Sequence, residues 1–262
     1  MEIFNSEDKT VTKIIHEDKS ETAIKLISGC STCEEKDRNK YSIFVSSSYG
    51  CQFNCKFCYL TLKQIPYKSL TKTAIINNLK EAITYKLEQE PSLSKKYAKI
   101  CWMGMGDAFV KTDKVTAVTE SSLNYILERG LAVGLDGVDL STVMPKVKNV
   151  DETFEHLKNL EHKLQEYPLN PHSDILVHRD KEFSNMGATY PDRSRFRLFY
   201  SLHSAIQESR DKLSPNAMAL DEAIPALLKY SENNKYNVIF HHMFMDGFND
   251  TEEEINALIE LI

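Results

Sequence analysis

A chain of 262 residues, 42% hydrophobic and 27% charged, has the composition of a globular protein and can bury a substantial core. That composition excludes disordered and fibrous classes, and no apolar run approaches the roughly 18–20 residues that a membrane span needs. The net charge of −6 argues against a broad phosphate-binding surface but is compatible with a local one. Because the N-terminal residues lack the basic and apolar segments of a secretory signal, we expect a cytoplasmic protein with no membrane partner.

The predicted elements begin with a β-hairpin at residues 10–27, where two β-branched-rich strands flank a polar turn at Glu17–Ser20. A strand at 42–48 follows and leads directly into a cysteine-rich loop. Helical and strand patterns then alternate. We predict helices at 71–90, 114–129, 151–166, 218–233 and 251–262, and strands at 98–103, 137–143, 196–202 and 236–244.

This alternation predicts five right-handed βαβ-type units and a parallel sheet. The fold class is therefore α/β, a partial (βα) barrel spanning residues 41–262 with an N-terminal β-hairpin extension in residues 1–40. Function is expected at the carboxyl ends of the strands. Residues 167–195 hold three prolines and no periodicity, and are expected to form an insertion of the kind that is often functional. Since the pattern stops after the fifth helix, we expect the last barrel strand to be absent.

Five of the six cysteines lie between positions 30 and 58, which in a cytosolic chain indicates a metal site. Cys51, Cys55 and Cys58 form a C-x3-C-x2-C pattern. Thiolates are the usual ligands of iron–sulfur clusters. Three cysteines would leave one iron of a cubane without a protein ligand, and an open coordination position lets a metal bind substrate.

A zinc site is the alternative reading of the same cysteines. Cys30, Cys33, Cys55 and Cys58 form two C-x2-C pairs, close to the spacing of a zinc ribbon. The chain would then be a non-catalytic zinc-binding module, and Cys51 would have no role.

Further polar motifs follow the predicted strands. The glycines of Met103–Asp107 (MGMGD) permit close approach to a ligand, and the Asp107 carboxylate can accept a hydrogen bond from an ammonium group. Similar strand-end positions are held by Ser141-Thr142, Ser201-Leu202-His203 and Asn249-Asp250. Each has an ordinary structural reading, such as a glycine-rich turn, strand-end hydroxyls or the N-cap of the last helix. Together they would meet at the carboxyl ends of the strands.

The cysteine spacing, with Phe57 before the last cysteine, resembles the signature of the radical S-adenosylmethionine (SAM) superfamily. In order, VSSSYGCQFNCKFC, MGMGD, DLST, SLHS and MDGFND resemble the branch of radical-SAM methyltransferases that modify adenosine C2 or C8 in ribosomal RNA, C2 enzymes also acting on transfer RNA. The resemblance runs from about residue 10 to residue 262.

The resemblance implies a [4Fe–4S] cluster on Cys51, Cys55 and Cys58, with SAM on the open iron. It also implies an electron donor such as flavodoxin or ferredoxin, cleavage of SAM to methionine and a 5′-deoxyadenosyl radical, and an RNA or nucleotide substrate. The segment ETAIKLI resembles the family strand that carries a glutamate base, which would give Glu21 that role. The residues implied to bind SAM are Phe57, Gly106, Asp107, Ser141, Ser201, Leu202, His203 and Asn249.

The sequence departs from this branch at the thiols that its methyl transfer requires. The family uses one cysteine near the C-terminus, for which this sequence has no counterpart, and another seven residues before the first cluster cysteine, where Phe44 stands. Asp107 replaces a glutamate, and Cys101 lies in an apolar strand and is expected in the core. We therefore expect radical chemistry without a methyl-cysteine step. The alternative is an RNA adenine methyltransferase that uses Cys30 or Cys33, or a missing C-terminal segment.

The strand at 236–244 is long and apolar, and a bare edge of that kind invites aggregation. We expect its outer side to be covered by the N-terminal hairpin, by residues 167–195 or by a partner chain.

Overall fold

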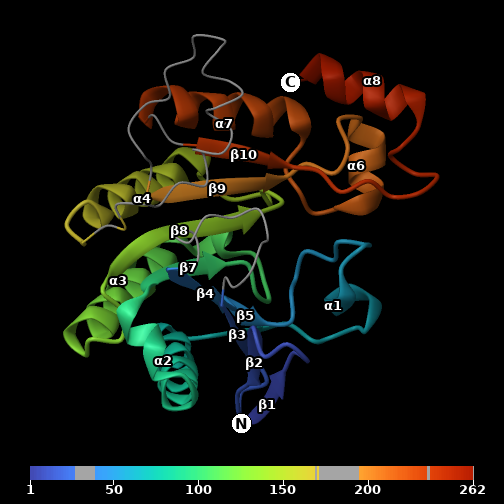
Figure 1. The fold of residues 1–262 in the computed structure, drawn as a ribbon. Helices are drawn as coiled ribbons and strands as arrows, with labels where there is room; N and C mark the ends of the chain where they lie inside the picture. Colours follow the sequence, from blue (N-terminus) through green and yellow to red (C-terminus); the bar gives the residue numbers. More distant parts are fainter. Residues whose placement is uncertain (27–38, 169, 171–194, 235–236, 262) are drawn as a thin grey trace, which may run out of the picture.

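An eight-stranded sheet forms the centre of the structure, a computed structural model that describes residues 1–26, 39–168, 170, 195–234 and 237–261 (Figure 1). The three N-terminal strands and the fourth pair antiparallel, and the remaining strands continue from the fourth in parallel. The spatial order is β1 (Glu2–Asn5), β2 (Val11–Ile15), β3 (Glu21–Leu26), β4 (Lys40–Val45), β7 (Tyr97–Trp102), β8 (Gly134–Thr142), β9 (Phe196–Ser201) and β10 (Asn237–His241).

Four long helices pack side by side on one face of this sheet (Figure 1). They are α2 (Lys72–Gln89), α3 (Thr112–Glu128), α4 (Val150–Leu164) and α7 (Leu220–Asn234). Side-chain caps fix the starts of two of them: Thr71 accepts from the N–H of Ala74 at 3.1 Å, and Asn149 accepts from the N–H of Glu152 at 3.2 Å.

Shorter elements connect the main layers. They are β5 (Ser48–Tyr49), α1 (Tyr59–Leu62), β6 (Lys68–Ser69), η2 (Pro91–Lys95), η3 (Ala108–Lys111), α6 (Gln207–Leu213) and α8 (Glu252–Leu261). Strands β5 and β6 pair antiparallel in a separate two-stranded sheet that brackets the cysteine loop and α1.

The parallel strands carry different residues on their two faces, because successive side chains of a strand point to opposite sides. Ile43, Ile100 and Leu198 are fully buried in the hydrophobic core on the helix-covered side. The opposite face, here called the inner face, carries polar and charged residues such as Lys99 and Asp139. This division provides a polar surface on which a site can form.

The predicted fold class is confirmed as a mixed α/β fold with a central parallel sheet. Each predicted strand and helix is present within a few residues of its expected bounds. The N-terminal hairpin gains a third strand, β1, in front of β2. The last predicted strand ends at His241 and not at residue 244, because the N–H of Met243 donates to the ring Nδ1 of His203, at 3.2 Å, instead of continuing the ladder.

One expectation about the sheet edge is wrong. The hairpin cannot cover β10, because β3 pairs with β4 and so lies at the other end of the sheet. In the described part of the chain no strand pairs with the outer edge of β10. Residues 167–195 lie largely outside the described residues, and a partner chain stays a prediction. The division at residue 40 also stays a prediction, since β2 and β3 belong to the same sheet as β4.

None of the helices in the described ranges is both long and apolar enough to cross a membrane.

Candidate active site

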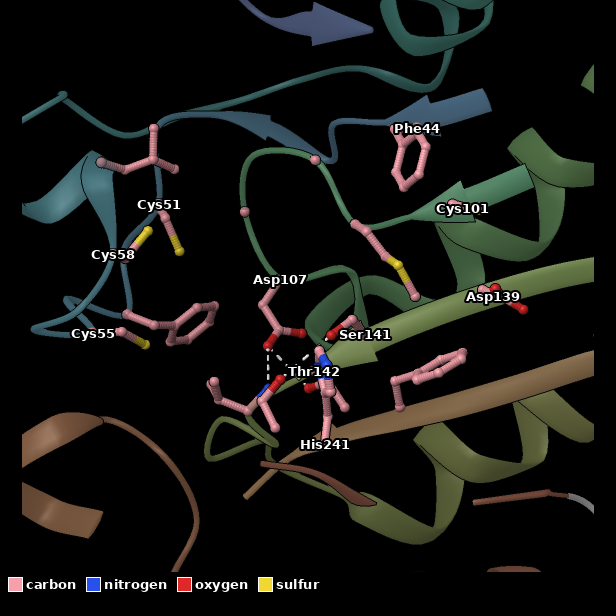
Figure 2. Close-up of a pocket in the computed structure, with 18 of the residues that line it drawn as sticks. Phe44, Cys51, Cys55, Cys58, Cys101, Asp107, Asp139, Ser141, Thr142 and His241 are labelled. Atoms are coloured by element: carbon pink, nitrogen blue, oxygen red, sulfur yellow. Dashed lines mark hydrogen bonds between the residues drawn. The ribbon is translucent and has the colours of Figure 1, made fainter. Parts of the chain in front are cut away.

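A cavity of about 510 Å³ opens on the inner face, at the carboxyl ends of the parallel strands. One wall is the cysteine loop, and the opposite wall is made by residues of β4, β7, β8 and β9 (Figure 2). The lining residues include Phe44, Cys51, Cys55, Phe57, Cys58, Lys99, Cys101, Gly106, Asp107, Asp139, Ser141, Ser201 and His241.

The three cysteines predicted to bind a cluster lie together on the loop side of the cavity (Figure 2). Phe53 of this loop forms a small apolar cluster with Val143 and Ala217, against which the cysteines pack. The N–H of Cys58 donates to the carbonyl of Cys55 at 3.0 Å, which closes a turn between these two ligands.

The segment that follows α6 fixes this loop from outside. The N–H of Lys56 donates to the carbonyl of Leu213 at 2.8 Å, and the side-chain amide of Asn216 donates to the carbonyl of Phe53 at 3.1 Å. The Ser214 hydroxyl lies 3.7 Å from the Cys55 sulfur. Leu213 and Asn216 thus position the cysteine loop, a role that their place in the sequence does not reveal.

The arrangement of the three cysteines is compatible with an iron–sulfur cluster. Among the described residues, no group of three or more His, Cys, Asp or Glu side chains is arranged to hold one metal ion. In an iron–sulfur cubane each thiolate binds a different iron, so the three sulfurs need not surround one point. Burial raises the pKa of Cys51 to about 11 and also raises that of Cys55, so cluster binding would release their protons. Cys30 and Cys33, the remaining ligands of the alternative zinc site, lie outside the described residues.

The MGMGD loop packs tightly against the serines that precede the cysteine loop. A Cβ at Gly104 would lie 2.6 Å from the Ser46 hydroxyl, and Gly106, at φ +86°, would clash with the Ser48 side chain. Hydrogen bonds join the two segments, from the N–H of Met105 to the Ser46 hydroxyl at 3.0 Å and from the N–H of Ser47 to the Met105 carbonyl at 2.9 Å. Glycine is therefore required at both positions for the loops to meet.

Asp107 is buried at the centre of the site, between the cysteine loop and the end of β8 (Figure 2). Its Oδ2 accepts from the Thr142 hydroxyl and from the N–H of Val143, both at 2.9 Å, and its Oδ1 accepts from the N–H of Phe109 at 3.0 Å. Burial raises the pKa of Asp107 to about 6, although these three hydrogen bonds oppose the shift. The carboxylate therefore both joins two loops and faces the cavity.

Other predicted SAM-binding residues also reach the cavity. Ser141 and Ser201 line it, with their hydroxyl oxygens 3.4 Å apart across neighbouring strands. The Phe57 ring lines it and makes an edge contact with the His203 ring, with 4.7 Å between centroids. Behind them, the fully buried Arg210 donates to the carbonyls of Ser201, Leu202 and Val143 and so ties the ends of β8 and β9 together.

Leu202, His203 and Asn249 are not among the described residues that line the cavity. The Asn249 side chain is held by three hydrogen bonds to backbone groups. Its amide donates to the carbonyls of His203, at 2.5 Å, and Met243, at 2.8 Å, and its oxygen accepts from the N–H of Met245. His203 has a φ of +57°, an unfavourable conformation for a residue with a Cβ, and the Asn249 bond helps to hold it. Their predicted contact with SAM stays a prediction.

Glu21, the predicted base, is likewise not among the described residues that line the cavity. It begins β3, and its carboxylate forms an ion pair with Lys13 of β2 at 2.7 Å. Its backbone carbonyl accepts a hydrogen bond from the Ser46 hydroxyl at 2.6 Å, which connects β3 to the MGMGD loop. Its catalytic role stays a prediction.

The far end of the cavity holds a row of charged residues that no sequence motif indicates. Asp139 on β8 bridges two cations, Lys99 on β7 at 2.5 Å and Arg197 on β9 at 2.7 Å. Cys101 is buried, as expected, but its side chain lines the cavity and not the helix-covered core (Figure 2). It lies opposite Phe44 in the register of β4 and β7. These neighbours come together only through strand register, which the chain order of the residues does not reveal.

Known proteins of similar sequence are RNA methyltransferases. No family model matches the chain. A probable dual-specificity RNA methyltransferase RlmN of Dictyoglomus turgidum is 25% identical over 86% of this chain and 52% of its own length. The corresponding protein of Akkermansia muciniphila is 25% identical over 100% of this chain and 60% of its own. The ribosomal RNA large subunit methyltransferase Cfr of Staphylococcus aureus is 24% identical over 100% of this chain and 64% of its own.

This chain is similar to the RlmN and Cfr RNA methyltransferases. The resemblance inferred from the motifs is therefore confirmed, and the chain spans between about half and two thirds of the length of these curated relatives. A solved radical SAM methyltransferase from Sphaerobacter thermophilus has the same fold, with a TM-score of 0.62 and 17% identity over 100% of this chain and 62% of that one.

Proposed function

We propose that this chain is a cytoplasmic radical-SAM iron–sulfur enzyme that cleaves SAM reductively and modifies RNA or a related nucleotide without a methyl-cysteine step. One observation carries the proposal: three cysteines of one loop face a cavity whose other walls come from the carboxyl ends of the parallel strands. The similarity to RNA methyltransferases supports the substrate class.

Each residue group has a separate task in this proposal. Cys51, Cys55 and Cys58 would hold a [4Fe–4S] cluster, which when bound supplies the electron for SAM cleavage. The Asp107 carboxylate would accept a hydrogen bond from the SAM ammonium group, and the glycine backbone at Gly106 would let SAM approach closely. The apolar surroundings of the loop would exclude water from the reacting atoms.

Product analysis tests the proposed reaction. The chain, reconstituted with iron and sulfide under anaerobic conditions and reduced, is expected to convert SAM to 5′-deoxyadenosine and methionine without added substrate. Mass spectrometry distinguishes these products from S-adenosylhomocysteine. Formation of S-adenosylhomocysteine alone would mean polar methyl transfer and would contradict the radical assignment.

The absence of a methyl-cysteine step is the finer part of the proposal. Phe44 occupies the position of one thiol that this step needs, and a phenyl ring forms neither a disulfide nor a nucleophile. We therefore expect neither a methylated cysteine nor C2-methyladenosine as a product.

One observation favours a second candidate, an RNA adenine methyltransferase that uses another thiol. Cys101 lines the cavity beside Phe44 and would be within reach of a substrate. Against this, burial raises the pKa of Cys101 to about 12, so the nucleophilic thiolate is scarce at neutral pH.

SAM with a deuterated methyl group separates the two candidates, with unmodified transfer RNA and ribosomal RNA fragments as substrates. The proposal predicts no label in protein cysteines or adenine rings. Label in either would establish the second candidate, and its loss in Cys101→Ala but not in Cys30→Ala would identify the thiol.

A further inference from the structure

The part of the chain around the cysteine loop has an unusual charge distribution. The whole chain has 38 acidic residues and a net charge of −6. Residues 40–80, however, contain six lysines and not one aspartate or glutamate. Of these lysines, Lys40 is buried against Asp136, Lys72 pairs with Asp113 and Lys80 lies over the Tyr125 ring. The exposed positive charge therefore comes from Lys56, Lys63 and Lys68.

Exposed apolar side chains stand among these lysines. Tyr59 is 65% exposed, Leu62 is 68% exposed and Tyr67 is 43% exposed. Lys63 and Lys68 flank them and are exposed as well. These five residues are here called the α1 surface, and Figure 1 shows α1 set apart from the row of helices that covers the sheet.

The α1 surface is joined directly to a proposed cluster ligand. Cys58 is the N-cap residue of α1, and its carbonyl accepts from the N–H groups of Thr61 and Leu62, both at 3.0 Å. The Lys63 ammonium lies 5.9 Å from the centre of the Tyr59 ring. Pairing of Lys68 with Tyr49 in the β5–β6 sheet holds the other end of the segment. The surface is therefore fixed relative to the cysteines.

We propose that the α1 surface is the docking site of an acidic one-electron carrier protein. The inference rests on the proposed function, because a cluster at these cysteines must receive an electron from outside the chain. The reduced carrier gives one electron to the cluster, which lowers the charge of the cluster by one. No covalent bond forms or breaks and no proton is transferred in this step.

The composition of the surface favours a redox protein over RNA. Nucleic-acid interfaces are dominated by polar and positively charged groups, with arginine prominent in base and phosphate contacts. The α1 surface has no arginine, and three of its five side chains are apolar or aromatic. Small interfaces with lysines around an apolar centre suit transient encounters, in which complementary charge mainly accelerates association.

Charge reversal tests the proposal. The variant Lys63→Glu/Lys68→Glu is compared with the control Lys25→Glu/Lys95→Glu. The control changes the net charge of the chain by the same amount, but at exposed lysines near the opposite, amino end of the parallel strands. Affinity for an oxidised, acidic flavodoxin is measured by calorimetry at low and high salt. We expect the α1 variant to bind about tenfold or more weakly at low salt, and the control variant to bind like the wild type.

SAM cleavage then provides the functional readout. With reduced flavodoxin as donor, the α1 variant is expected to be slower than the control, while both cleave SAM equally with dithionite. Equal flavodoxin affinity in the two variants would overturn the docking site. So would a loss of RNA binding with unchanged flavodoxin affinity, which would assign the surface to nucleic acid. If the wild type cleaves no SAM even with dithionite, the proposed function fails, and the calorimetric comparison still decides the docking site.

Discussion

Replacing Asp107 by asparagine separates its role in SAM binding from its role in the fold. In the proposed function the ionised carboxylate accepts a hydrogen bond from the SAM ammonium group. Such a charge-assisted bond contributes about 1.5–3 kcal/mol, so Asp107→Asn is expected to weaken SAM binding roughly ten- to hundredfold.

The stability of the protein should change much less. An asparagine oxygen can still accept from Thr142 and Val143, but the amide group then faces the N–H of Phe109, and an unsatisfied buried donor costs about 1–3 kcal/mol. The substitution also removes a buried charge. The pKa of Asp107 is raised from 3.8 to about 6, which corresponds to a cost of about 3 kcal/mol for ionising it in the folded state. The two effects oppose each other, so we expect a small shift of the melting temperature at pH 7.

The pH dependence of SAM binding gives the sharper test. With its pKa at about 6, Asp107 becomes protonated in the free protein as the pH falls through 6. SAM affinity should therefore decrease up to about tenfold per pH unit below 6 and level off above pH 7. The stability contribution of this group has the opposite sign: its folded-state pKa exceeds the unfolded value, so its contribution is present below pH 4 and lost as the pH rises to 6.

Calorimetric titrations of SAM between pH 5 and 7.5 measure this dependence for the wild type, Asp107→Asn and the exposed control Asp113→Asn. The wild type and the control should share the pH-dependent profile, and Asp107→Asn should bind weakly with a flat one. A flat wild-type profile, or the same slope in Asp107→Asn, would refute the assignment of Asp107 as the ammonium acceptor.

The remaining predictions concern the supports of the site. Arg210→Met removes the donor to three buried carbonyls and should lower the melting temperature by more than about 5 °C, whereas the exposed Lys212→Met should not. Equal melting temperatures of the two variants would show that Arg210 does not hold the ends of β8 and β9 together. Gly106→Ala should strongly weaken SAM binding, because its φ of +86° and the Ser48 side chain exclude a Cβ and the loop that carries Asp107 would have to shift; unchanged affinity would show that glycine is not required at this position. Glu21→Gln breaks a partly exposed ion pair with Lys13 that contributes about 0.2–1 kcal/mol, so stability should hardly change; if product formation also survives, Glu21 is not the base.

Most of the fold was predictable because its periodic signals are local. The strands that alternate with amphipathic helices gave both the element types and the parallel order. Several short elements were missed, and β1 and α6 show the physical reasons. The four residues of β1 are largely exposed and carry no buried stripe, and α6 is short and polar, with Arg210 and Leu213 as its buried residues.

The candidate site was predictable where one short segment provides several groups. The cysteine spacing indicated the loop. The glycines of MGMGD were expected to make room for a ligand, and in the structure they make room for Ser46 and Ser48, while the approach of a ligand stays a prediction. The row that joins Lys99, Asp139 and Arg197 was not predictable, because its members meet only through the register of three strands. For the same reason Cys101, which reads as a core residue in an apolar strand, turns out to face the cavity.

Iron content is the most direct test of the central claim that Cys51, Cys55 and Cys58 hold a cluster. After anaerobic reconstitution with iron and sulfide, the wild type, Cys30→Ala and Cys101→Ala should each bind about four iron atoms per chain. Alanine at any one of the three predicted ligands should remove most of that iron. Retention of the cluster in Cys51→Ala together with its loss in Cys30→Ala, or a colourless wild-type protein that binds zinc instead, would contradict the assignment.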